Sequence, residues 1–179
     1  MSLAAGEVYW ALVPYTPQAP FQIYTEGSSP LEVPSVDQIV DGLRAGGDAE
    51  FGFLVRAKAR PILLLSERSD PRTGDHFGLR LLRLSELSTE EREAVRDQRE
   101  PLLFHLRPEH MANLPEESAA LISAPIRIHE SALDTRRLLG QLDKNEMRVL
   151  SERFVSYWRF DLHQLLVAKI RELQARWNG

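Results

Sequence analysis

The sequence predicts a mixed α+β fold, with a small, curved, mostly antiparallel sheet followed by helices at the C-terminal end. Short apolar or β-branched runs separated by turn residues recur along most of the chain, and these runs are typical of strands. The last part carries apolar residues at helical spacing instead. No internal repeat or convincing linker divides the sequence, so a single domain over residues 1–179 is expected.

The expected strands are runs rich in Val, Leu, Ile and aromatic residues. Five prolines place residues 14–34 in a loop, with an edge strand at 21–24. The run 61–66 (PILLLS) is apolar without alternation, which is typical of a strand buried on both faces. The run 51–55 is expected to pair with it. The full set of expected strands is 6–13, 21–24, 51–55, 61–66, 78–84, 101–106, 119–128 (interrupted at Pro125) and 136–142.

Capping residues mark where the helices begin. Ser88, followed three positions later by Glu91, forms a capping-box pattern ahead of a polar stretch. Asp143 and Glu146 repeat the pattern near the C-terminus. The expected helices are 35–46, 89–99 and 144–177.

Composition excludes several classes of site. The chain has no cysteine, which rules out disulfides, thiolate nucleophiles and cysteine-based zinc sites. No apolar run approaches the roughly 20 residues of a membrane span. The N-terminus also lacks the features of a signal peptide, so a cytoplasmic protein with no membrane segment is expected.

Motifs for metals and cofactors are missing as well. No two histidines are spaced i, i+4, so no metal site is expected. The sequence contains no glycine-rich nucleotide-binding motif and no Gly-x-Ser-x-Gly, so no cofactor is expected either. The histidines considered are His76, His105, His110, His129 and His163.

Charge is unevenly distributed along the chain. The net charge is −4, and residues 1–70 hold nine acids and five bases, whereas the rest holds 17 of each sign. Four cations form one local basic cluster within the acidic part: Arg56, Lys58, Arg60 and Arg68. Such a cluster could follow the phosphates of a single-stranded nucleic acid, and it could equally be the solvated rim of a strand–turn–strand unit.

Four segments share a pattern when taken in order. They are Gly6–Trp10, Arg60–Ser66, Leu81–Ser85, and Ile126–Asp134 with Leu139–Leu142. They match a Gly-acidic-aliphatic opening strand, an Arg-Pro before an aliphatic strand, a strand that ends in Thr or Ser, and an Ile-Arg-x-x-Asp followed by Gly-x-Leu and a terminal helix. Together these segments resemble the MazF/PemK toxin family of ribonucleases. The chain departs from the family by two insertions, at about 14–50 and 86–118.

The resemblance implies an SH3-like barrel and a growth inhibitor that cleaves single-stranded RNA without a metal. It also implies a homodimer and inhibition by a partner antitoxin. Arg60 would stabilise the phosphorane, since a guanidinium binds phosphate bidentately and stays charged. Ser85 would be its hydroxyl partner, and Arg56, Lys58 and Arg68 would contact RNA.

Other interpretations remain open at this point. Tyr9 and Trp10 could offer a stacking surface for bases or could belong to the core. The apolar residues of the terminal helix, Trp158 and Trp177 among them, suit a core or a dimer interface. The long insertions and the acidic first part also fit a non-catalytic SH3-like protein-interaction module.

Overall fold

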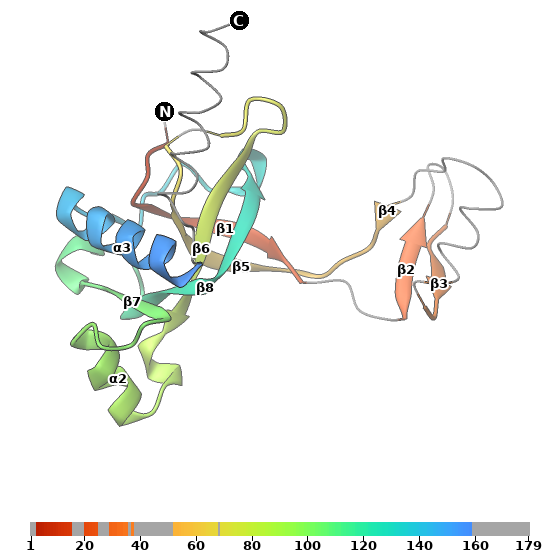
Figure 1. Cartoon of the computed structure of the whole chain (residues 1–179). Coiled ribbons are helices and arrows are strands. Elements are labelled where there is room, and N and C mark those ends of the chain that lie inside the picture. The colour runs from red at the N-terminus through yellow and green to blue at the C-terminus, as the bar shows by residue number, and fades with distance from the viewer. Residues whose placement is uncertain are drawn as a thin grey trace, which may run out of the picture.

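The computed structural model describes residues 3–15, 20–24, 29–35, 37, 52–67 and 69–158. These residues form two antiparallel sheets and two α-helices (Figure 1). The larger sheet contains β1 (Glu7–Pro14), β5 (Ala57–Leu64), β6 (Asp75–Arg83), β7 (Leu103–Leu106), β8 (Ser118–His129) and β9 (Gly140–Gln141). The smaller sheet contains β2 (Phe21–Tyr24), β3 (Leu31–Val33) and β4 (Gly52–Phe53), and the helices are α2 (Thr89–Arg96) and α3 (Lys144–Tyr157).

The six strands of the larger sheet lie in the order β7-β8-β6-β5-β1-β9, and each neighbouring pair is antiparallel. The mixed α+β class and the mostly antiparallel sheet are therefore confirmed. The two end strands, β7 and β9, do not pair with each other in the described part of the chain. The sheet is open there, and closure into a barrel is not observed.

Both faces of the sheet are covered, because β5 buries side chains on each side. Ile62, Leu63 and Leu64 are completely buried, as the apolar run predicted. Leu63 packs with Leu150 of α3 in one cluster, whereas Ile62 and Leu64 belong to a cluster on the other face with Leu133. Strand β5 thus contributes side chains to two hydrophobic clusters, one on each face of the sheet.

Both predicted capping boxes are present. The Ser88 hydroxyl accepts a hydrogen bond from the Glu91 N–H, and Asp143 does the same for the Glu146 N–H. These caps satisfy backbone donors that the first helical turn leaves free. None of the described helices has the length and hydropathy needed to cross a membrane. Of the expected helix 35–46 only residues 35 and 37 are described, and the expected segment 159–177 lies outside the described residues.

The partner of one strand and the bounds of two others differ from the prediction. The run 51–55 supplies only β4, which pairs with β2 and not with 61–66, so that pairing was wrong. Residues 57–60, which fall between the two expected runs, extend β5 because the second half of β1 pairs with them. The run 136–142 is reduced to the two residues of β9.

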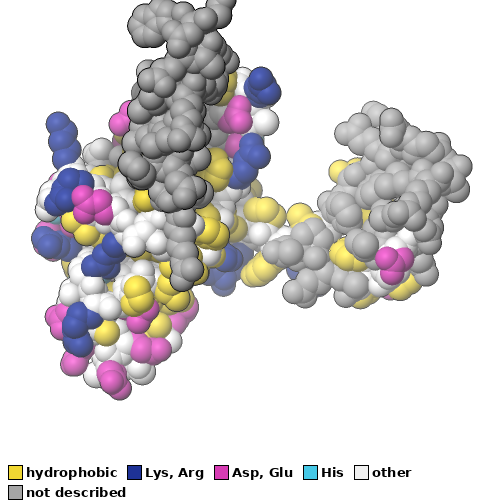
Figure 2. All heavy atoms as spheres, viewed as in Figure 1, with side chains coloured by type: hydrophobic (Ala, Val, Ile, Leu, Met, Phe, Trp, Pro, Cys, Tyr) yellow, Lys and Arg dark blue, Asp and Glu magenta, His cyan; other side chains and the backbone are white. Residues whose placement is uncertain are grey.

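The smaller sheet stands apart from the larger one and is reached along the ends of β1 and β5 (Figure 1). We call these strand ends, with the adjoining Tyr15 and residues 54–56, the arm. The Tyr15 N–H donates to the Arg56 carbonyl at 2.8 Å. The segment that leads out to the smaller sheet and the segment that returns from it therefore lie side by side. Figure 2 shows hydrophobic side chains gathered along this connection. Its exposed apolar residues are Leu12, Tyr15, Leu54 and Val55.

Candidate functional site

A cleft opens where β5 and β6 separate. The two strands pair only at Ile62–Leu64 with Gly78–Arg80. Beyond this point Lys58–Pro61 keep their pairing with β1, and Leu81–Arg83 keep theirs with β8. The space between the strands has a volume of about 190 Å³. Its charged lining residues are Lys58, Arg60, Arg83, Glu86 and Glu116.

Arg60 contributes a cation to this cleft. It is partly buried on β5 and forms no ion pair or side-chain hydrogen bond with another described residue. Lys58, two positions earlier on the same strand, is exposed and also lines the cleft. Arg56 is exposed at the arm and does not line it. Arg68 lies outside the described residues.

Glu116 occupies the opposite wall and is held by two partners. Its Oε1 lies 3.1 Å from Nη1 of Arg83, and its Oε2 accepts a hydrogen bond of 3.0 Å from the Ser85 hydroxyl. Ser85 is exposed in a short 3-10 helix, Leu84–Glu86, and is not among the lining residues. The structure therefore connects Ser85 to the cleft through Glu116 and not through Arg60.

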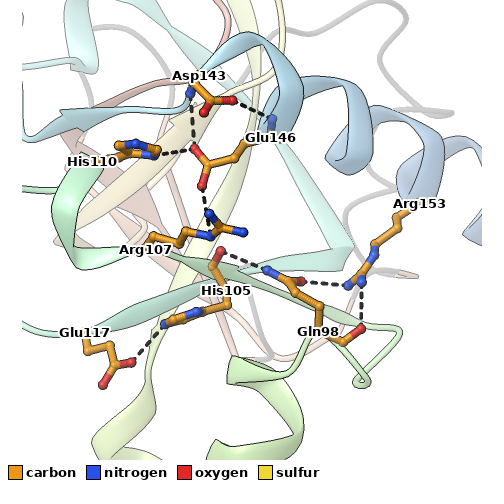
Figure 3. Close-up of polar contacts among 8 residues, drawn as sticks. All are labelled: Gln98, His105, Arg107, His110, Glu117, Asp143, Glu146 and Arg153. Atoms are coloured by element: carbon orange, nitrogen blue, oxygen red, sulfur yellow. Dashed lines mark hydrogen bonds and ion pairs between the residues drawn. The ribbon is translucent and has the colours of Figure 1, made fainter.

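The backbone that carries Glu116 is fixed by its neighbour Glu117. The Glu117 carboxylate accepts a hydrogen bond from Arg96 Nε at 2.9 Å. It also lies 2.9 Å from Nε2 of His105 (Figure 3). Its carbonyl accepts the N–H of Leu84. The hydrogen bond from Arg96, aided by His105, lowers the pKa of Glu117 to about 2, so this carboxylate stays ionised.

A second polar cluster lies at the start of α3 (Figure 3). His110, Asp143 and Glu146 offer ligand atoms within 4.8 Å of one another. His110 Nδ1 lies 2.6 Å from Glu146 Oε2, which also accepts the Asp143 N–H, and Arg107 Nε lies 3.6 Å from Glu146 Oε1. The positive charge of the Arg107 guanidinium, so close to this carboxylate, disfavours binding of a metal cation there. We interpret the cluster as a set of polar contacts that attaches the start of α3 to residues 107–110.

The two aromatic residues of β1 have different surroundings. Tyr9 is buried, and its hydroxyl donates to Glu7 Oε2 at 3.1 Å. Burial, together with the Glu7 charge, raises the pKa of Tyr9 to about 12. Trp10 is partly buried and lines the cleft. Of the two, only Trp10 can contact a ligand there.

Sequence reasoning missed Arg83, Glu86 and Glu116. Arg83 stood inside the segment Leu81–Ser85, where only the hydroxyl was considered. Glu116 fell in a stretch, 107–118, that carries no periodic pattern. A carboxylate in such a stretch has no local signal, because only the pairing of β6 with β8 brings it beside Arg83.

No protein-family model matches the chain, and no curated protein matches it either. The assignment of a function thus depends on the geometry of the cleft and on the sequence segments described above.

Proposed function

We propose that this protein is a MazF/PemK-like growth inhibitor that cleaves single-stranded RNA without a metal ion. The observation that carries the proposal is the cleft itself, because Arg60, whose guanidinium pairs with no other described residue, and Glu116 line the same small space. The ordered sequence segments support the same function. The SH3-like barrel that the resemblance implies remains a prediction, since β7 and β9 do not pair with each other in the described chain.

The chemistry requires a proton acceptor and a cation near one phosphate. In the proposed reaction the ribose 2′-oxygen attacks the adjacent phosphorus, and its proton passes to the Glu116 carboxylate. The bond from phosphorus to the 5′-oxygen then breaks, and that oxygen takes a proton from water. The products are a 2′,3′-cyclic phosphate and a 5′-hydroxyl. Arg60 stabilises the extra negative charge of the phosphorane.

Arg83 and Ser85 position the proposed base. Each contacts a different oxygen of Glu116, which restricts rotation of the carboxylate. Lys58 adds a second positive charge at the entrance and is suited to the neighbouring phosphate. Arg56, farther along the arm, would contact RNA outside the cleft.

The test is incubation of pure protein with a mixed-sequence single-stranded RNA library in EDTA. Cleavage is expected for the wild type, and Arg60→Ala should reduce its rate by about 10²-fold or more, as removal of a charge-stabilising donor does. Arg72→Ala removes an exposed arginine from a turn and is the matched control. Absence of cleavage, or equal cleavage by Arg60→Ala and the wild type, would refute the enzymatic proposal.

A non-catalytic protein-interaction module is the second candidate. It is favoured by the exposed apolar side chains of the arm, of which Leu12 is 58% and Tyr15 is 50% exposed. The first candidate is preferred because Arg60 and Glu116 line the same cleft.

The resemblance also proposes two protein partners, a second copy of this chain and an inhibitory antitoxin. Support for a homodimer comes from the end of α3, where Tyr157 is 42% and Trp158 is 41% exposed. Large aromatic side chains are enriched at the centres of protein interfaces.

A further inference from the structure

We infer that the cavity beside the cleft is a nucleobase pocket, in which one base of a single-stranded RNA stacks on Trp10. The inference rests on the proposed function, because it places an RNA phosphate in the cleft of Arg60. It gives the stacking surface that Trp10 could offer a defined place, and it adds a determinant of substrate binding that the cleft chemistry does not use.

Two cavities share Trp10 and Ala59 as common lining residues, so they adjoin one another. The cleft measures about 190 Å³, whereas the neighbouring cavity measures about 570 Å³. Only the larger volume falls within the range of about 300–1,000 Å³ that is typical of small-molecule pockets. The pair thus offers a small charged space and a larger one on either side of the same indole-bearing residue.

The larger cavity lies along the edge of β1 that faces away from β5. β9 pairs only with Glu7 and Val8, and beyond them residues 131–136 follow the edge instead. The Asp134 N–H donates to the Trp10 carbonyl at 2.8 Å, and Ala11 forms an isolated bridge with Leu133. These two contacts fix the far wall of the cavity relative to Trp10.

The lining offers an apolar surface, which suits the face of a base, and a polar rim, which suits its hydrogen-bonding edge. Trp10, Leu12 and Leu133 supply apolar area, and among the described residues Trp10 is the one aromatic residue lining either cavity. Asp134 and Arg136 supply a polar rim, with Arg136 Nε donating to Asp134 Oδ1 at 2.8 Å.

This combination favours an unpaired base over a second phosphate. The Asp134 carboxylate would repel a phosphate, while its acceptor oxygens and the remaining Arg136 donors can bind the polar edge of a base. Aromatic side chains stack bases of single strands, whose faces are accessible, whereas duplex RNA keeps its base faces covered. The pocket therefore selects single-stranded RNA and contributes affinity separately from the charges of the cleft.

The test is a thermodynamic cycle on binding alone. Short single-stranded 2′-O-methyl oligoribonucleotides, labelled with fluorescein, cannot be cleaved by 2′-oxygen attack and report binding by fluorescence anisotropy. One oligonucleotide carries mixed bases, and a matched one carries abasic sites throughout. Each is titrated against the wild type, Trp10→Ala and Trp10→Phe, with Phe77→Ala as the control for loss of an exposed aromatic ring elsewhere.

The wild type should bind the base-containing oligonucleotide more tightly than the abasic one by about 5- to 150-fold, which corresponds to stacking of one base. Trp10→Ala should lose this difference while keeping its affinity for the abasic strand, and Trp10→Phe should retain part of it. Equal binding of both oligonucleotides by the wild type overturns the nucleobase pocket, and this comparison needs no variant. RNA cleavage that persists in that case leaves the proposed function standing, whereas absence of binding to either strand refutes both.

Discussion

Arg83 and Glu116 form an ion pair across the end of the cleft, with 3.1 Å between Nη1 and Oε1. The pair joins the last residue of β6 to the segment that precedes β8, and these two strands are neighbours in the sheet. Sheet pairing thereby places a carboxylate opposite Arg60. The same pair gives the first prediction, because one partner has a proposed chemical role and the other a positioning role.

Glu116→Gln should reduce the rate of RNA cleavage by about 10²- to 10⁴-fold, the usual loss when a general base is removed. The amide keeps the size of the side chain and can still accept the Ser85 hydrogen bond, so the fold should be retained. Ser85→Ala should have a much smaller effect, since it removes one positioning contact. Initial rates on one RNA substrate measure both effects, with exposed Glu109→Gln as the control. Wild-type rates for Glu116→Gln would exclude this residue as the base.

Glu117 should make folding stability sensitive to acid. Its pKa falls from 4.5 to about 2 in the folded chain, so its contribution is present above about pH 4.5 and is lost as the pH falls toward 2. Glu117→Gln should lower the free energy of unfolding on the order of 1 kcal/mol at neutral pH, with screening of this partly exposed group taken into account. Near pH 2 the difference should largely vanish.

Urea unfolding at the two pH values checks this prediction, with Glu109→Gln again as the control. A difference between Glu117→Gln and the wild type that stays constant from neutral pH to acid would show that ionisation of Glu117 is not its source.

Gly140→Ala should destabilise the protein, because β9 lies tightly against residues 110–111. A Cβ at position 140 would lie 2.6 Å from the His110 carbonyl oxygen and 2.7 Å from Met111 Cα. Both are backbone atoms that cannot rotate away. We expect a loss of about 1–3 kcal/mol, typical of overpacking, visible as a lower melting temperature in circular dichroism. An unchanged melting temperature would contradict this packing of β9.

Trp158→Glu tests the proposed homodimer. The Trp158 indole N–H donates to the Ile122 carbonyl, yet the residue is 41% exposed and leaves apolar surface for a partner. Light scattering of the wild type at micromolar concentration should give about twice 20.4 kDa, and the variant should give the monomer mass without unfolding. A wild-type mass near 20.4 kDa would refute the dimer. An unfolded variant would place Trp158 in the intrachain core and the interface elsewhere.

Features that depend on neighbours in the sequence could be predicted well. The Ser88 and Asp143 capping boxes involve residues three positions apart, and the buried strand at 61–66 is apolar throughout. These signals are local, so no knowledge of the tertiary fold is needed to find them.

Partners in the sheet could not be predicted in the same way. The run 51–55 has the composition of a strand, but its choice of β2 over β5 depends on where the first insertion places it. Arg60 was found through its Arg-Pro context, whereas Glu116 becomes visible only when β6 and β8 are paired. The cleft combines both kinds of residue, so sequence reasoning named Arg60 on one side of it and did not name Glu116 on the other.

The pairing of the outgoing and returning strands at the arm has an evolutionary consequence. Pro14 and Ala57 are paired neighbours on adjacent strands, so the intervening segment begins and ends at a single point of the scaffold. A single genetic insertion into an ancestral hairpin is enough to add such a lobe, and a single deletion is enough to remove it. The larger sheet and this appendage are thus free to diverge at different rates.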